Sequence, residues 1–149
     1  MKSSRSFWLW VIHVAAVVGI VASGESILAH YSIVSSTFCT INATFNCDVV
    51  NKSEYSELFG IPVSVFGLIA YLAALLFSIW LRLRKEERVL TGLLLLAVGG
   101  FTFSLYLTSI EAFVLYTWCI VCLTSQASIL AILIASLKLR GIDQPTQIV

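Results

Sequence analysis

Two cysteine pairs dominate the chemistry that this sequence can support. Cys119 and Cys122 stand three positions apart in an apolar run that opens at Phe113, while Cys39 and Cys47 lie in the only long polar segment. These are the four cysteines of the chain. Thiol–disulfide exchange moves two electrons at a time through mixed disulfides, so a loop pair can pass electrons to a membrane pair. The pattern therefore indicates a redox relay between water and lipid.

The elements that must position these cysteines are membrane helices. The chain has 149 residues, of which 59% are hydrophobic and 11% charged, with a mean hydropathy of +0.97. A soluble globule of this composition could not cover its surface with polar groups. We expect an all-α integral membrane protein, a four-transmembrane-helix bundle in one domain, 1–149, because apolar runs of about 20 residues cross a core of ~30 Å. The expected spans are 7–29, 61–81, 89–109 and 113–137, followed by a disordered tail at 141–149.

Basic residues predict the orientation of this bundle. Of the nine lysines and arginines, all but Lys52 fall at the termini or between the second and third spans. By the positive-inside rule that side is cytoplasmic, so the loop 31–60 and all four cysteines face outward, toward an oxidising compartment. The net charge of +1 gives no reason to expect a nucleic-acid partner. A cleaved signal peptide is the alternative for the first run, but the run exceeds the ~7–15 residues typical of signals.

The depth of the membrane pair indicates its electron acceptor. At 1.5 Å per residue, Cys119 lies about 9 Å below Phe113, where the headgroup of an isoprenoid quinone can reach. Residues i and i+3 share a helix face, so Cys119 and Cys122 can form a disulfide. The alternatives are two static structural disulfides, or a four-cysteine zinc site that lacks a neighbouring histidine ligand.

Other polar residues have less specific interpretations. His13 lies inside the first span, where we expect a packing or hydrogen-bonding role, and Glu25 lies close enough to its outer end to reach water. A proton relay is the alternative for Glu25. In the outer loop, the segment 53–57 is expected to form a short helix with Ser53 as its N-cap.

These residues carry a family resemblance. The run 113–122, FVLYTWCIVC, resembles the fourth-span signature of the vitamin K epoxide reductase family. The loop cysteines, Ser53, the segment 64–67 (SVFG) and Tyr71 are similar to that family's loop and second span. The spacing agrees from Cys39 to Cys122, and the first span fits in topology only. Members are four-helix bundles around a quinone pocket, sometimes with an added thioredoxin-like domain, which we do not expect here.

The resemblance implies a direction of electron flow. Cys39 would take electrons from a thioredoxin-fold, DsbA-like thiol protein, Cys47 would exchange with Cys119, and Cys122 would reduce a membrane quinone. That quinone would be ubiquinone, menaquinone or vitamin K, and no metal is expected. The residues implied for the quinone pocket are Ser53, Tyr55, Val63, Ser64, Phe66, Tyr71, Leu107, Leu115 and Gln126.

Two positions depart from the animal members of that family. Those members have an asparagine, which binds the naphthoquinone carbonyl, where this chain has Val63, and a tyrosine where it has Gln126. Each lost donor removes about 1 kcal/mol. The segment 59–64 (FGIPVS) is more similar to prokaryotic members, which oxidise a DsbA-like partner. We therefore expect a thiol:quinone oxidoreductase that supports disulfide formation, in a prokaryotic cytoplasmic membrane with its active site outward. The alternative is a vitamin K quinone or epoxide reductase in the endoplasmic reticulum membrane, with its site lumenal.

Overall fold

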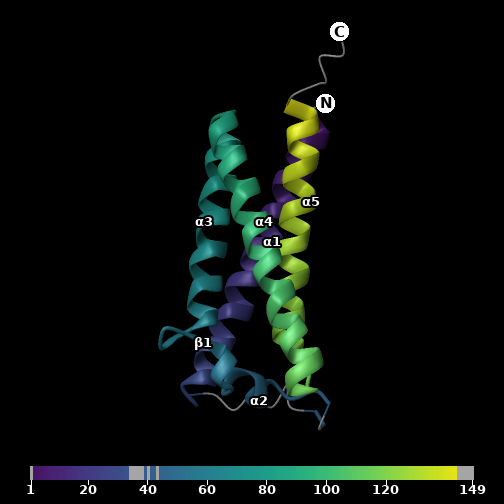
Figure 1. The fold of residues 1–149 in the computed structure, drawn as a ribbon. Helices are drawn as coiled ribbons and strands as arrows, with labels where there is room; N and C mark the ends of the chain where they lie inside the picture. Colours follow the sequence, from purple (N-terminus) through teal and green to yellow (C-terminus); the bar gives the residue numbers. More distant parts are fainter. Residues whose placement is uncertain (1, 34–38, 40, 43, 144–149) are drawn as a thin grey trace.

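Four long helices run alongside one another and form a bundle (Figure 1). The structure, a computed structural model, describes residues 2–33, 39, 41–42 and 44–143. Each long helix is long and apolar enough to cross a membrane. The expected all-α membrane bundle is therefore confirmed, and the chain is a multi-pass membrane protein. The helices are α1 (Lys2–His30), α3 (Val63–Leu83), α4 (Glu87–Ile110) and α5 (Ile120–Asp143).

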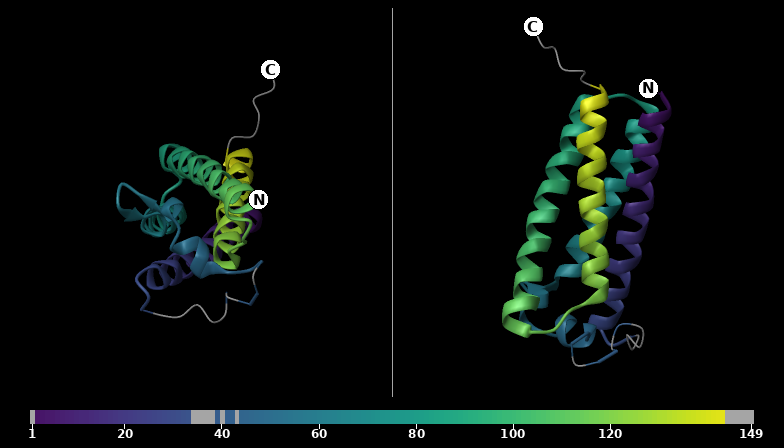
Figure 2. Two further views of the ribbon diagram at one scale, coloured as in Figure 1. Left: turned by 60° about the horizontal axis from the view of Figure 1, so that its bottom comes forward. Right: turned by 90° about the vertical axis from the view of Figure 1, so that its right-hand side faces the viewer.

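The polar loop and the connection between α3 and α4 lie at opposite ends of the bundle. The start of α1, the end of α5 and that connection are at one end, and the segment that follows α1 is at the other (Figures 1 and 2). The basic residues 82–88 therefore lie far from the cysteines. At the basic end Arg5 on α1 binds Asp143 on α5, with Nε 3.2 Å from Oδ1, and donates to the carbonyl of Leu81 on α3.

Small side chains allow α1 to approach its neighbours closely. Gly19 faces the ring of Tyr71, and a Cβ atom at position 19 would collide with that ring. The Tyr71 hydroxyl donates to the carbonyl of Ser125 at 2.6 Å and lies 2.9 Å from its Oγ, so one side chain connects α1, α3 and α5. His13 Nδ1 lies 2.7 Å from Ser78 Oγ and 2.9 Å from the Leu9 carbonyl, which is the hydrogen-bonding role expected for it.

Residues 44–62 form short elements at the end of the bundle opposite the connection between α3 and α4. Helix α2 (Cys47–Asn51) was not expected; it begins because the Asn46 side chain accepts hydrogen bonds from the N–H groups of Asp48 and Val49. The expected short helix is a 3₁₀ turn, η1 (Glu54–Ser56). Ser53 occupies its N-cap position, but its hydroxyl donates backward to the Val50 carbonyl at 2.8 Å. A hairpin of β1 (Glu57–Leu58) and β2 (Ile61–Pro62) then leads into α3.

The expected start of the fourth span at Phe113 is wrong. Helix α4 instead continues into a π-helical turn, η2 (Glu111–Leu115), and Tyr116 ends it in the left-handed conformation with φ 50°. Residues 116–119 are not helical, and α5 begins only at Ile120. Cys119 therefore precedes the helix rather than lying two turns inside it. Hydropathy did not reveal this break because every residue from 113 to 116 is apolar or aromatic.

Two further boundaries differ from expectation. Helix α3 begins at Val63 rather than Ile61, because Ile61 and Pro62 pair with β1. Residues 141–143 belong to α5 rather than to a disordered tail, since Asp143 is held by Arg5. The rest of the tail, from residue 144 on, lies outside the described residues.

Candidate active site

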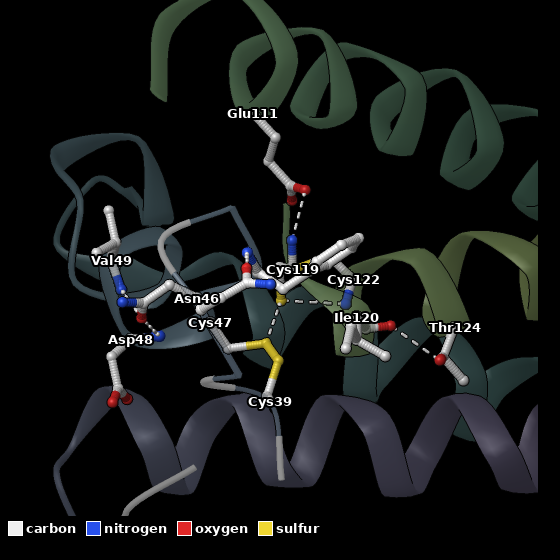
Figure 3. The surroundings of a disulfide bond; sticks show 12 residues. Cys39, Asn46, Cys47, Asp48, Val49, Glu111, Cys119, Ile120, Cys122 and Thr124 are labelled. Atoms are coloured by element: carbon white, nitrogen blue, oxygen red, sulfur yellow. Dashed lines mark hydrogen bonds between the residues drawn. A yellow bond between two sulfur atoms is a disulfide. The ribbon is translucent and has the colours of Figure 1, made fainter. Parts of the chain in front are cut away.

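Three cysteine sulfurs meet at the loop end of the bundle (Figure 3). Cys39 and Cys47 are joined in a disulfide, and Cys47 Sγ lies 3.1 Å from Cys119 Sγ. The Sγ atoms of all three residues lie within 4.8 Å of one another. Because two of them share a disulfide, the group as it stands is not a set of thiolate metal ligands. Its geometry suits exchange between the Cys39–Cys47 bond and the free Cys119 thiol.

Backbone pairing between distant segments sets this sulfur contact. The N–H of Trp118 donates to the Thr44 carbonyl at 2.8 Å, and the N–H of Asn46 donates to the Trp118 carbonyl at 3.2 Å. Asn46 also caps α2, whose first residue is Cys47. The residues immediately before Cys47 and before Cys119 are thus hydrogen-bonded to each other. The side chains of Cys47 and Cys119 are fully buried, each with 0% exposure.

Cys119 occupies the N-cap position of α5. Its carbonyl accepts from the N–H of Leu123 at 2.9 Å, and its sulfur accepts from the N–H of Cys122 at 3.2 Å. This is the hydrogen bond that a serine or aspartate side chain makes at the start of a helix. The positive end of the helix dipole adds to it. Negative charge on the Cys119 sulfur, which develops during exchange, is therefore stabilised.

Glu111 was not identified from the sequence, although it is an acidic residue between two apolar runs. It is the first residue of η2, its side chain is 3% exposed, and its Oε2 accepts from the N–H of Cys119 at 3.2 Å. Its backbone carbonyl accepts from the N–H groups of Tyr116 and Thr117. Glu111 thus joins the end of α4 to the start of α5, directly above the sulfurs (Figure 3).

A cavity of about 370 Å³ opens beside this sulfur cluster, between the helices and the loop. Its wall is mainly apolar, with serine, threonine and tyrosine hydroxyls distributed over it. Such a combination of size, apolar lining and few polar groups is typical of small-molecule sites. The thiol-bearing residue Cys122 lines the cavity, whereas Cys39, Cys47 and Cys119 do not.

Most residues implied for the pocket lie on this wall. Val63, Ser64 and Phe66 begin α3, and Tyr71 lies two turns further along it. Gln126 does not line the cavity; its Oε1 accepts from the hydroxyl of Thr108, which does. The residues found on the wall are Ser53, Tyr55, Val63, Ser64, Phe66, Tyr71, Leu107 and Leu115.

Asn51 and His30 also line the cavity but were not expected there. The Asn51 carbonyl accepts from His30 Nδ1 at 2.7 Å and from Ser56 Oγ at 2.7 Å, and His30 Nε2 lies 3.2 Å from Glu57 Oε1. The Asn51 side chain makes no hydrogen bond within the described part of the chain, although the residue is only 8% exposed. Its amide is therefore free to bind a ligand in the cavity. Asn51 does not stand out in the sequence, because a polar loop offers many such side chains.

A comparison with models of known protein families finds a match to most of this chain. The model of the Vitamin K epoxide reductase family matches residues 10–137, which is most of the chain. A search of curated proteins finds no match.

Proposed function

Because the chain belongs to the vitamin K epoxide reductase family, we propose that it is a membrane thiol:quinone oxidoreductase. It would oxidise a thioredoxin-fold, DsbA-like thiol protein and reduce a membrane quinone, and so support disulfide formation. The observation that carries this proposal is the 3.1 Å contact between Cys47 Sγ and Cys119 Sγ, next to a cavity that Cys122 lines. A static structural disulfide has no need of a free thiol against it.

Electrons pass between the two pairs by thiolate attack. The partner's dithiol first reduces Cys39–Cys47 and leaves as a disulfide. The Cys47 thiolate attacks Cys119 of an oxidised Cys119–Cys122 pair, forming a Cys47–Cys119 bond and releasing Cys122. Cys39 then attacks Cys47, which restores the loop disulfide and releases Cys119. The arrangement described above, with the loop pair bonded and Cys119 and Cys122 free, fits the end of this sequence.

The second half of the cycle takes place in the cavity. Cys119 and Cys122 give two electrons to a quinone and become a disulfide. The volume and apolar wall suit the ring of ubiquinone, menaquinone or vitamin K, while Tyr55 and Ser64 offer hydroxyl groups. Asn51 offers an amide donor on the same wall.

The distribution of charge supports a location and orientation. The basic residues between α3 and α4 lie at the end of the bundle opposite the cysteines; they are Arg82, Arg84, Lys85 and Arg88. By the positive-inside rule, that basic end is cytoplasmic. The sulfur cluster would then face outward from a prokaryotic cytoplasmic membrane, where a DsbA-like partner is available. An endoplasmic reticulum membrane with a lumenal site is the alternative.

Quinone reduction by the purified protein tests this function. With a reduced DsbA-like protein and decylubiquinone, we expect partner-dependent quinol formation that is abolished in Cys122→Ala. Thr124→Ala is the matched control, because Thr124 is an exposed residue two positions further along α5. Equal activity in Cys122→Ala would refute the route.

A trapped intermediate tests the contact that carries the proposal. The double variant Cys39→Ser with Cys122→Ser leaves Cys47 and Cys119, whose sulfurs need to close only from 3.1 Å to a bond length of about 2.05 Å. We expect mild oxidation to join them quantitatively, as detected by loss of maleimide labelling. The reciprocal variant, which leaves Cys39 and Cys122, should retain two free thiols. If the wild-type cysteines formed only static structural disulfides, those bonds would instead resist reduction in physiological redox buffers.

The second candidate is reduction of vitamin K quinone or its epoxide on the same scaffold. The family assignment favours it, whereas Val63 and Gln126 disfavour it because neither supplies the animal-type donor at the cavity. Val63→Asn combined with Gln126→Tyr should raise epoxide turnover from a low basal level. Efficient turnover by the unmodified chain would make this second activity the correct one.

A further inference from the structure

Quinone reduction needs two protons as well as two electrons, and the proposed function leaves their path open. Both protons come from thiols that lie among buried groups. Cys119 is 0% exposed, and Cys122 borders a mainly apolar cavity. A side chain that exchanges protons, lies beside both sulfurs and also lines the cavity would give these protons a path.

Glu111 has the position that this role requires. One carboxylate oxygen, Oε2, is held by the N–H of Cys119, and the carboxyl group also lies close enough to the Cys122 thiol to interact with it. Glu111 also lines the cavity, so its carboxyl group lies beside both membrane cysteines and at the edge of the space that a ligand would occupy.

No other acidic residue shares this position in the part of the chain that the structure describes. Among the described residues that line the cavity, Glu111 is the only carboxylate. Glu25, also on a membrane helix, is exposed on α1 and does not line it. The other titratable side chains on the wall are His30, Tyr55, Tyr71 and Cys122. The π-helical turn that places Glu111 here is a feature often found at functional sites.

We propose that Glu111 is a catalytic residue that carries protons from the membrane cysteines to the quinone, an inference that rests on the proposed function. The carboxylate takes the proton of the Cys122 thiol and delivers it to the nearer quinone oxygen. The Cys119 proton follows over the same carboxylate, so that one proton ends on each of the two quinone oxygens. Two S–H bonds break, one S–S bond forms between Cys119 and Cys122, and two electrons and two protons reach the quinone. Glu111 ends the cycle as it began, a carboxylate.

A purely structural role for Glu111 predicts different behaviour. If the carboxylate only connects η2 to the N–H of Cys119, glutamine can replace it, because the amide oxygen accepts the same hydrogen bond. Glu111→Gln keeps the size and the acceptor but cannot take up a proton. Glu111→Asp keeps the acid on a shorter side chain. Comparison of the two variants thus separates the effect of the hydrogen bond to Cys119 from the effect of proton transfer.

A single-turnover experiment on the full-length chain tests the proposal. Reduced protein in nanodiscs is mixed with decylubiquinone under anaerobic conditions, and quinol formation is followed from pH 5.5 to 9. For Glu111→Gln we expect a rate 10²- to 10⁴-fold lower, the usual contribution of a general acid–base, with a flattened pH profile. Glu111→Asp should retain part of the activity, with a shifted profile. Glu25→Gln is the matched control and should react at the wild-type rate.

Electron transfer from the loop pair to the membrane pair, measured by thiol alkylation, distinguishes the remaining outcomes. We expect that transfer to change less than threefold in Glu111→Gln. A wild-type rate and pH profile for quinol formation in Glu111→Gln would overturn the proposal, as would equal slowing of both steps. If Glu111→Gln does not assemble, a wild-type pH profile in Glu111→Asp overturns it. A wild-type protein that forms no quinol would instead contradict the proposed function itself.

Discussion

Replacing Gly19 by alanine should damage both the bundle and the cavity. The new Cβ would collide with the ring of Tyr71, which is 3% exposed and cannot turn away without losing its hydrogen bonds to Ser125. Overpacking costs ~1–3 kcal/mol, and a lost hydrogen bond adds ~0.5–1.5 kcal/mol. Removing a glycine from a helix returns ~1 kcal/mol. The net loss is about 2 kcal/mol, which lowers Tm by ~4–8 °C in a protein of this size.

Thermal unfolding in detergent, followed by circular dichroism, measures this loss. Gly24→Ala is the control on the same helix, because a Cβ there meets nothing within 4 Å, and its Tm should equal or exceed that of the wild type. Since Tyr71 lines the cavity, Gly19→Ala should also raise KM for quinone, whereas Gly24→Ala should not. A Tm for Gly19→Ala as high as that of Gly24→Ala would refute the packing argument.

Two further substitutions test the cavity and the distant end of the bundle independently of each other. Asn51→Leu keeps the side-chain size but removes the free amide from the cavity wall, so KM for quinone should rise roughly 2- to 12-fold, the equivalent of one hydrogen bond. An unchanged KM in steady-state assays would show that this amide does not bind the ring. Arg5→Gln breaks the partly buried pair with Asp143 and the bond to Leu81, and should lower stability by about 1–3 kcal/mol. Because Arg5 lies at the opposite end of the bundle, kcat and KM should stay unchanged; a change in either would show that the two ends are coupled.

Hydropathy and charge were sufficient to predict four spans and to bring the cysteines to one end, because both depend on residue type alone. The break between α4 and α5 depends on backbone geometry instead. Tyr116 adopts a left-handed conformation, and Trp118 pairs with Asn46, which is 72 positions away. A local apolar pattern contains no signal for such pairing. The same limit explains why Glu111 was not identified, since its place in the site depends on a hydrogen bond from the N–H of Cys119, on the other side of that break.

The cavity could be anticipated only in part. Residues on α3 were found through the family motif, whereas Asn51 reaches the wall because α2 folds across the end of the bundle. That short helix begins at a side-chain cap on Asn46 within a loop rich in polar residues, where many alternative turns have similar composition. Gln126 lies off the wall because its amide is turned toward Thr108.

The burial of the loop disulfide has a consequence for selectivity. Cys39 is 3% exposed and Cys47 is fully enclosed, so small dissolved thiols such as glutathione cannot approach either sulfur in line. Under the proposed function, a partner protein would have to move the chain around these sulfurs before its thiol could attack. Oxidation would then depend on recognition of a whole protein surface rather than on reducing strength, and dissolved small thiols would not reduce the quinone.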